Sequence, residues 1–182
     1  MERRILQPEQ IIVPYEYKLG NEAILGIYFR IFDRGHGEDL PPVLVAKPNH
    51  SDRDSLLRHF VDKEGFERYF KTIDEMGNVL YLMDGNHRGV AATLCRKPIS
   101  AIELQNDDDL ARLEEMVKTG EYFNLPNFPQ EYPKLGKLRS AVTYLEGEQK
   151  SRKILTLKQR VDKLTSNGDL PQYMKERYLR GK

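Results

Sequence analysis

The run Asp84-Gly85-Asn86-His87-Arg88-Gly89 places a carboxylate, an imidazole and a guanidinium within six residues. It follows the apolar run Val79–Met83, which is typical of a strand, and precedes Val90–Cys95, which continues as a helix. Gly85 permits a sharp turn with positive φ. The next three amides then lie at the start of a helix, where partial positive charge gathers an anion. Arg88 adds a guanidinium of the kind that binds phosphate oxygens with paired hydrogen bonds. The sequence therefore predicts a phosphate-binding turn.

Asp84 has several possible roles at the mouth of this turn. Its carboxylate could orient a hydrogen-bond donor, hold Mg²⁺ against a phosphate, or act as a base. A purely structural interpretation competes with these: Asp84 caps the helix, Arg88 pairs with a surface acid, and His87 is exposed. The residues of the turn leave both interpretations open.

The elements around the turn follow from periodicity and from the placement of glycine, proline and capping residues. Val43–Ala46 is a β-branched run after two prolines, which predicts a strand buried on both faces. The expected helix caps are Asn21, Ser51, Asn106, Thr156 and Asp169. The expected strands are Ile5–Leu6, Ile11–Val13, Val43–Ala46, a hairpin of Tyr69–Ile73 with Val79–Met83, and Ile99–Leu104. The expected helices are Glu22–Phe32, Asp52–Asp62, Val90–Cys95, Asp107–Lys118, Lys137–Glu146, Leu157–Thr165 and Leu170–Leu179.

Length and composition limit the class of protein. The 182 residues are 39 % hydrophobic and 31 % charged, which is too apolar for a disordered chain and too polar for a membrane-embedded one. No window approaches 18 consecutive apolar residues, so no membrane partner is expected. The single cysteine, Cys95, has no internal disulfide partner, and no Cys/His cluster has zinc spacing. We expect a cytoplasmic protein.

Charge is unevenly distributed along the chain. Residues 1–130 carry 16 Lys/Arg and 22 Asp/Glu, a net charge of −6, whereas residues 131–182 carry 13 and 6, a net charge of +7. A basic C-terminal segment suits DNA binding, although a solvated helix face or docking on the acidic body explains it equally. The densest basic cluster consists of Lys150, Arg152, Lys153, Lys158 and Arg160.

The turn and its flanks, Leu80–Ala92, resemble the signature of the ParB/sulfiredoxin superfamily, whose members place a Gly-x-x-Arg turn at the start of a helix. Gln10–Glu16 resembles the family's entry strand, Pro42–Lys47 its central strand, and Lys97–Ile99 the beginning of the next element. The resemblance covers residues 5–105, with an insertion at about 48–73. It implies an α/β (α+β) domain over residues 1–120, built on a small mixed sheet flanked by helices. Residues 121–182 would then form a loop and a helical C-terminal extension.

Within this superfamily the form Asp-Gly-x-His-Arg is closest to the free serine kinases. Sulfiredoxins need a reactive cysteine in the turn, where this chain has Asn86 and His87, and chromosome-partition ParB proteins carry an arginine pair that is absent here. The alternative within the superfamily is a ParB-like DNA-binding protein or nuclease that uses the basic C-terminal cluster. The serine kinases have His at the position of Asn86, and residues 106–182 show no counterpart of their C-terminal lobe.

The resemblance implies roles for individual residues. Glu16, Asp84 and His87 would be catalytic, with Glu16 near the substrate hydroxyl and Glu9 a weaker candidate for that role. Asp84 would also contact Mg²⁺. The activity implied is phosphoryl transfer from a nucleotide, ATP or ADP, to a small hydroxyl substrate or to water. The phosphates would be held by Gly85, Asn86, His87 and Arg88.

Overall fold

The computed structural model describes residues 1–13, 21–48, 63–123, 136–147 and 154–180. Its centre is a six-stranded mixed sheet with the order β1-β5-β3-β4-β2-β6. β5 and β3 are parallel neighbours, β4 and β2 form a second parallel pair, and the β3–β4, β1–β5 and β2–β6 pairs are antiparallel. The strands are β1 (Glu2–Leu6), β2 (Ile11–Val13), β3 (Val43–Ala46), β4 (Leu80–Asp84), β5 (Ile99–Leu104) and β6 (Leu155–Thr156). The α/β class expected from the sequence is confirmed.

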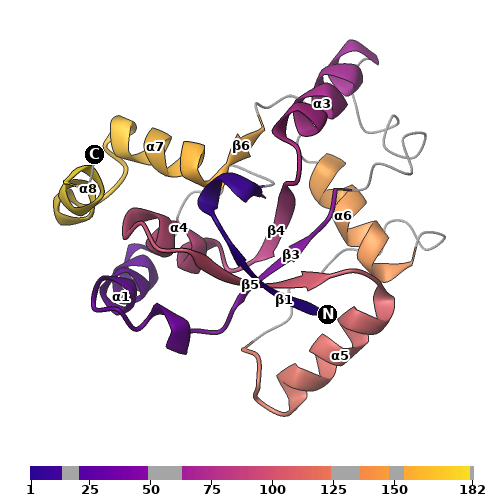
Figure 1. Ribbon diagram of the computed structural model, residues 1–182, viewed down its shortest axis with the longest axis horizontal. Coiled ribbons are helices and arrows are strands. Elements are labelled where there is room, and N and C mark those ends of the chain that lie inside the picture. The colour runs from indigo at the N-terminus through magenta and orange to yellow at the C-terminus, as the bar shows by residue number, and fades with distance from the viewer. Residues whose placement is uncertain (14–20, 49–62, 124–135, 148–153, 181–182) are drawn as a thin grey trace.

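Helices cover both faces of the sheet (Figure 1). One face carries α1 (Glu22–Asp33), α4 (Asn86–Leu94), α7 (Leu157–Asn167) and α8 (Gln172–Leu179). The other carries α3 (Lys63–Met76), α5 (Asp107–Lys118) and α6 (Lys137–Gly147). Short 3₁₀ turns, η1 (Pro8–Gln10) and η2 (Gly37–Asp39), lead into β2 and toward β3. The molecule is therefore a three-layer α/β/α arrangement.

The two hydrophobic cores follow from strand alternation. Along β4, Leu80 and Leu82 pack in the core of α1 and α4, whereas Tyr81 and Met83 pack in the core of α3 and α5. All four residues of β3 are buried, as the apolar run 43–46 predicted. A strand buried on both faces reads as a continuous apolar run, and this is why the central strands were recognisable from sequence.

Helix caps also agree with the sequence prediction at three positions. The side chains of Asn21, Asn106 and Thr156 accept hydrogen bonds from the third amide of α1, α5 and α7. The cap predicted at Asp169 is wrong: α8 begins after Pro171, which has no capping side chain. The predicted helix 52–62 and its cap Ser51 lie outside the described residues.

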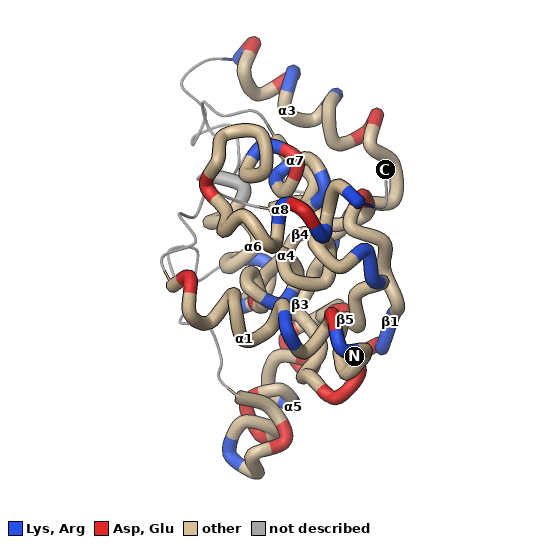
Figure 2. The backbone as a smooth tube through the Cα atoms, turned by 90° about the vertical axis from the view of Figure 1, so that its left-hand side faces the viewer, with Lys and Arg blue, Asp and Glu red and all other residues tan. Residues whose placement is uncertain are grey.

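The predicted strand Tyr69–Ile73 is wrong, because these residues belong to α3. Phe66, Tyr69, Phe70 and Ile73 are the buried residues of that helix. Their spacing of three and four places all of them on one helical face, which packs against the sheet. Acidic and basic residues are interleaved on the remaining surface of α3 (Figure 2). Over five residues the two periods cannot be told apart, whereas the 14 residues of α3 show the helical period.

The C-terminal segment shares the sheet and both cores with the rest of the chain. β6 pairs with β2, with Ile12 opposite Thr156. Leu157 and Val161 of α7 are fully buried in the core of α1 and α4, and α6 contributes Val142 to the other core. β6 thus completes the sheet on one side, and α6, α7 and α8 cover part of its two faces.

Candidate functional site

The turn from β4 to α4 lies where the strands end, next to the carboxyl end of β2, the parallel neighbour of β4. β2 and β4 run in the same direction with Ile12 opposite Tyr81, so β2 ends at the edge where β4 ends in Asp84. Gly85 connects the strand to α4 with φ 97°. The edge therefore collects the carboxyl ends of two strands and the amino end of one helix.

Only glycine fits at position 85. A Cβ atom there would lie 2.7 Å from Val43 Cγ1 and 2.9 Å from Val43 Cβ, and the positive φ adds strain to any L side chain. The turn is thus pressed against the start of β3. Because the N-cap has no side chain, it cannot satisfy the amides that follow.

The first turn of α4 leaves its amides available. Gly89 N donates to Gly85 O at 2.8 Å and begins the helical hydrogen bonds. The backbone N–H groups of Asn86, His87 and Arg88 have no acceptor among the described residues, and the first turn contains no acidic side chain. Three parallel donors at the positive end of a helix form an anion-binding arrangement.

Two side-chain atoms beside these amides are also unsatisfied. Asn86 Oδ1 and His87 Nε2 are buried and have no hydrogen-bond partner within the described part of the chain. Buried polar atoms in folded proteins are nearly always hydrogen-bonded, so such a pair indicates a partner that comes from outside. Burial, together with the positive charge of Arg160, lowers the pKa of His87, and the imidazole is therefore neutral at pH 7.

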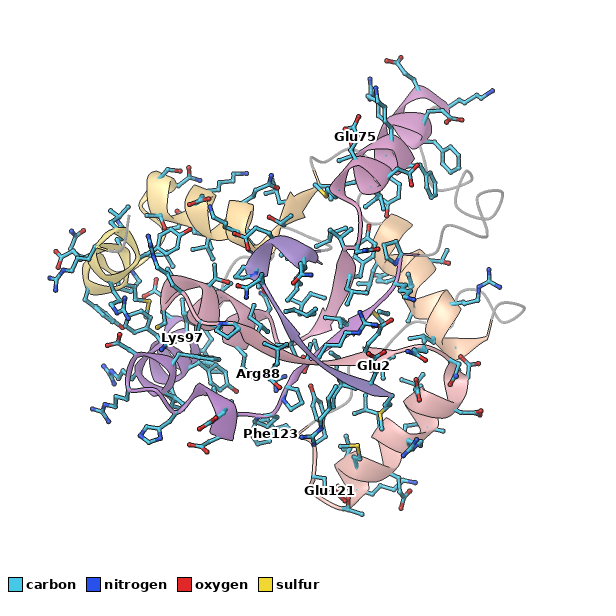
Figure 3. The ribbon with its side chains drawn as sticks, in the orientation of Figure 1. Glu2, Glu75, Arg88, Lys97, Glu121 and Phe123 are labelled. Carbon is cyan, nitrogen blue, oxygen red and sulfur yellow. The ribbon has the colours of Figure 1, made fainter. Side chains whose placement is uncertain are left out.

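The side chain of Arg88 is directed into the protein (Figure 3). Its Nη1 donates to Pro41 O at 2.8 Å and to Pro42 O at 3.2 Å, and its Nη2 donates to Asp84 Oδ2 at 2.7 Å and to Tyr122 Oη at 3.1 Å. All four terminal N–H groups are engaged, and the residue is 5 % exposed. The side chain of Arg88 therefore links the turn to the residues that precede β3, whereas its backbone N–H lies at the amino end of α4.

Tyr122 completes this buried network from the segment after α5. Its hydroxyl lies 3.0 Å from Pro42 O and 3.1 Å from Asp84 Oδ2, and the Arg88 guanidinium lies 5.7 Å from the centre of its ring. Burial, reinforced by the charge of Asp84, raises the pKa of the Tyr122 hydroxyl, so it remains a neutral donor. The hydroxyl and the guanidinium together fix the Asp84 carboxylate.

Asp84 is held through one oxygen only. Oδ2 accepts from Arg88 and Tyr122, whereas Oδ1 has no hydrogen bond to any described residue. The side chain is 37 % exposed. No group of three or more His, Cys, Asp or Glu suited to a metal occurs in the described ranges. A Mg²⁺ ion at Oδ1 would therefore take its other ligands from phosphate and water, which is the usual manner of Mg²⁺ binding in phosphoryl-transfer sites.

Asp84, Gly85, Asn86 and His87 lie together at the turn. The guanidinium of Arg88, which we expected to bind phosphate, is instead engaged by protein groups, and the residue contributes its backbone N–H to the turn. Glu16 lies outside the described residues. The three basic residues of the C-terminal cluster that precede α7 also lie outside them: Lys150, Arg152 and Lys153.

The described members of the basic cluster do not share an exposed face. Arg160 is 4 % exposed and acts electrostatically on His87. Lys158 is paired with Asp162 at 2.7 Å. Nothing in the described part of this cluster favours a DNA-binding surface.

The sequence did not predict that two further residues, Tyr122 and Arg160, belong to the site. Tyr122 is 34 positions from Arg88 and was not predicted to belong to the site, and Arg160 was assigned to the basic cluster. Neither has a local motif. The one sequence signal of burial is that Arg160 has apolar neighbours on its helical face at i−3 and i+4, Leu157 and Leu164 of α7.

Comparison with protein-family models, with curated proteins and with solved structures found no match for this chain. Within the described residues, none of the helices has the length and hydrophobicity needed to span a bilayer.

Proposed function

We propose that this chain is a ParB/sulfiredoxin-like protein that binds the phosphates of a nucleotide, ATP or ADP, at the amino end of α4. The observation that carries the proposal is the row of three unpaired amides at residues 86–88, with the unsatisfied His87 Nε2 beside them. A phosphate supplies oxygen acceptors for the amides. It also supplies an acceptor for His87 in the tautomer that carries a proton on Nε2.

The roles of the two charged residues differ from each other in this proposal. Arg88 keeps the turn closed by bonding the carbonyls of Pro41 and Pro42, so it contributes its amide to the phosphate. Arg160 of α7 contributes positive potential at His87. Together they offset the negative charge of Asp84, which would otherwise repel an anion.

The reaction we propose is phosphoryl transfer to a small hydroxyl substrate or to water. With ATP, the acceptor oxygen attacks the γ-phosphorus, the bond from that phosphorus to the β-γ bridging oxygen breaks, and ADP leaves. With ADP, the attack is at the β-phosphorus, the bond to the α-β bridging oxygen breaks, and AMP leaves. Asp84 Oδ1, or Glu16 as the family resemblance implies, takes the proton of the attacking hydroxyl. Where Asp84 Oδ1 held Mg²⁺ instead, the ion would neutralise charge on the phosphate oxygens, and Glu16 would be the base. A nucleotide substrate and a single, buried thiol suit a cytoplasmic location.

The test is nucleotide binding measured by isothermal titration calorimetry, followed by an assay for phosphate or ADP release. We expect ATP or ADP to bind in the presence of Mg²⁺, and His87→Ala to weaken binding about tenfold or more through loss of a hydrogen bond to a charged group. His36→Ala is the matched control, because His36 is exposed and its ion pair is with the exposed Asp39. Asp84→Asn should abolish turnover.

Three results would decide against parts of the proposal. Absence of binding across a panel of nucleotides would refute the site itself. Equal affinity of the His87→Ala and wild-type proteins would place the phosphate elsewhere. Binding without any turnover would leave a regulatory module that uses the nucleotide as a switch, and the catalytic role of Asp84 would be rejected.

A further inference from the structure

A cavity lies at the opposite ends of the strands from the Asp84 turn. β3 and β5 are parallel and in register, so Ala46 and Leu104 end side by side. β3 runs antiparallel to β4, and its carboxyl end is therefore remote from the end at which Arg88 binds Pro41 and Pro42. A ligand here would not touch the proposed phosphate site.

The cavity has an apolar floor and a basic rim. Its volume is about 380 Å³, which is in the range of small-molecule sites. Ala46 and Leu104 form the end of the sheet, and Leu138 and Val142 of α6 close over them. Lys47 and Arg139 stand at the rim, and none of the described lining residues is acidic. An apolar pocket with cations at its mouth is complementary to an organic anion.

Lys47 is available to such a ligand because its ion pair is the weaker of two. The carboxylate of Glu103 is completely buried, with Arg4 Nε at 2.6 Å from Oε2 and Lys47 Nζ at 3.8 Å from Oε1. Arg4 therefore supplies the close counter-charge to Glu103. The Lys47 side chain is 71 % exposed, and its ammonium can turn to a ligand while Glu103 remains paired.

The backbone N–H groups around this cavity already have acceptors, so they offer a ligand few hydrogen-bond donors. Gln105 N donates to Asp109 Oδ2 at 2.9 Å, and the first amides of α6 donate to the carboxylate of Asp107. Because these donors are already satisfied, recognition of an anion at the rim falls to the side chains of Lys47 and Arg139. The helix terminus of α6 is thus not the anion site.

We propose that this cavity binds a small organic anion with an apolar body, such as a short-chain carboxylate, whose charged group lies between Lys47 and Arg139. The apolar part would lie on Ala46, Leu104 and Val142. Burial of the chain supplies the affinity, and the two cations select the sign of the charged group.

The test uses three probes with the same apolar body: hexanoate, hexanol and hexylammonium. Each is titrated into the full-length protein at neutral pH, and amide chemical shifts are followed by NMR. We expect hexanoate to shift the amides of Gln105 and Val142 in a saturable way, hexanol to bind more weakly, and hexylammonium to bind least. This comparison needs no variant and is independent of folding effects.

Variants then locate the charged group. Lys47→Gln combined with Arg139→Gln should weaken hexanoate about three- to tenfold and leave hexanol unchanged, as expected for two exposed charge contacts. Lys71→Gln is the matched control, since Lys71 is 77 % exposed and also forms a 3.8 Å ion pair, with Glu75. Equal binding of the three probes, shifts elsewhere in the protein, or an unchanged hexanoate affinity in the double variant would each overturn the proposal. Loss of nucleotide binding in the His87→Ala variant has no bearing on these outcomes.

Discussion

Removing the Tyr122 hydroxyl tests the network that fixes Asp84. Tyr122→Phe keeps the ring, which is 2 % exposed, and deletes only the oxygen that lies between Arg88, Asp84 and Pro42. Among the described residues, Arg88 Nη2 then retains Asp84 as its acceptor and Asp84 Oδ2 retains Arg88 as its donor. No cavity larger than the hydroxyl is created, so the change in stability reports the hydrogen bonds.

The expected magnitude follows from the two kinds of bond. A neutral hydrogen bond contributes about 0.5–1.5 kcal/mol, and one to a charged group about 1.5–3 kcal/mol. Because Asp84 is 37 % exposed and water can replace part of what is lost, we expect a loss near the lower end, about 2 kcal/mol. For a chain of 182 residues this corresponds to a decrease in melting temperature of about 4–8 °C.

The assay is urea unfolding followed by circular dichroism, with Tyr173→Phe as the control. Tyr173 is 46 % exposed, and its hydroxyl has no hydrogen bond in the described part of the structure, so its variant should match the wild type. If Tyr122→Phe unfolds at the same urea concentration and with the same slope as the wild type, the network does not stabilise the turn. A loss of stability with full retention of turnover would show that Asp84 does not need this hydroxyl for its orientation.

Three further predictions concern single residues. Gly85→Ala should destabilise the protein by about 3 kcal/mol or more, measured by urea unfolding, because a Cβ meets Val43 at 2.7 Å in left-handed backbone; a neutral effect would mean that the turn relaxes freely. Burial raises the pKa of the Cys95 thiol to about 12, so a thiol reagent at pH 8 should label the protein only after unfolding; rapid native labelling would contradict this. Burial opposes ionisation of Asp109, but bonds from the N-terminal ammonium and Gln105 N outweigh it and lower the pKa. The stability difference between wild type and Asp109→Asn should therefore be full above about pH 4 and disappear as the pH falls through the folded pKa, measured by unfolding at several pH values; a constant difference would refute the assignment.

Local signals determined much of the fold. The buried strands β3 and β4 are recognisable because runs buried on both faces are continuously apolar, and the caps Asn21, Asn106 and Thr156 mark helix starts because their side chains satisfy nearby amides. The strand–glycine–helix turn is predictable for the same reason: Gly85 and its neighbours impose it over a few residues.

The tertiary structure alone decided where the side chains of the turn are directed. Arg88 resembles a phosphate ligand in sequence, yet its guanidinium binds Pro41, Pro42 and Tyr122, which are 34–47 positions away. Arg160 resembles part of a surface cluster, yet it is buried beside His87. A buried charged side chain must be hydrogen-bonded or paired, because desolvation without a partner is costly. Its partners come from distant parts of the chain, which the pairing of strands and the packing of helices bring close to it. The motif therefore specifies a helix amino end with open amides, and the assembled core specifies which neighbouring charges act on it.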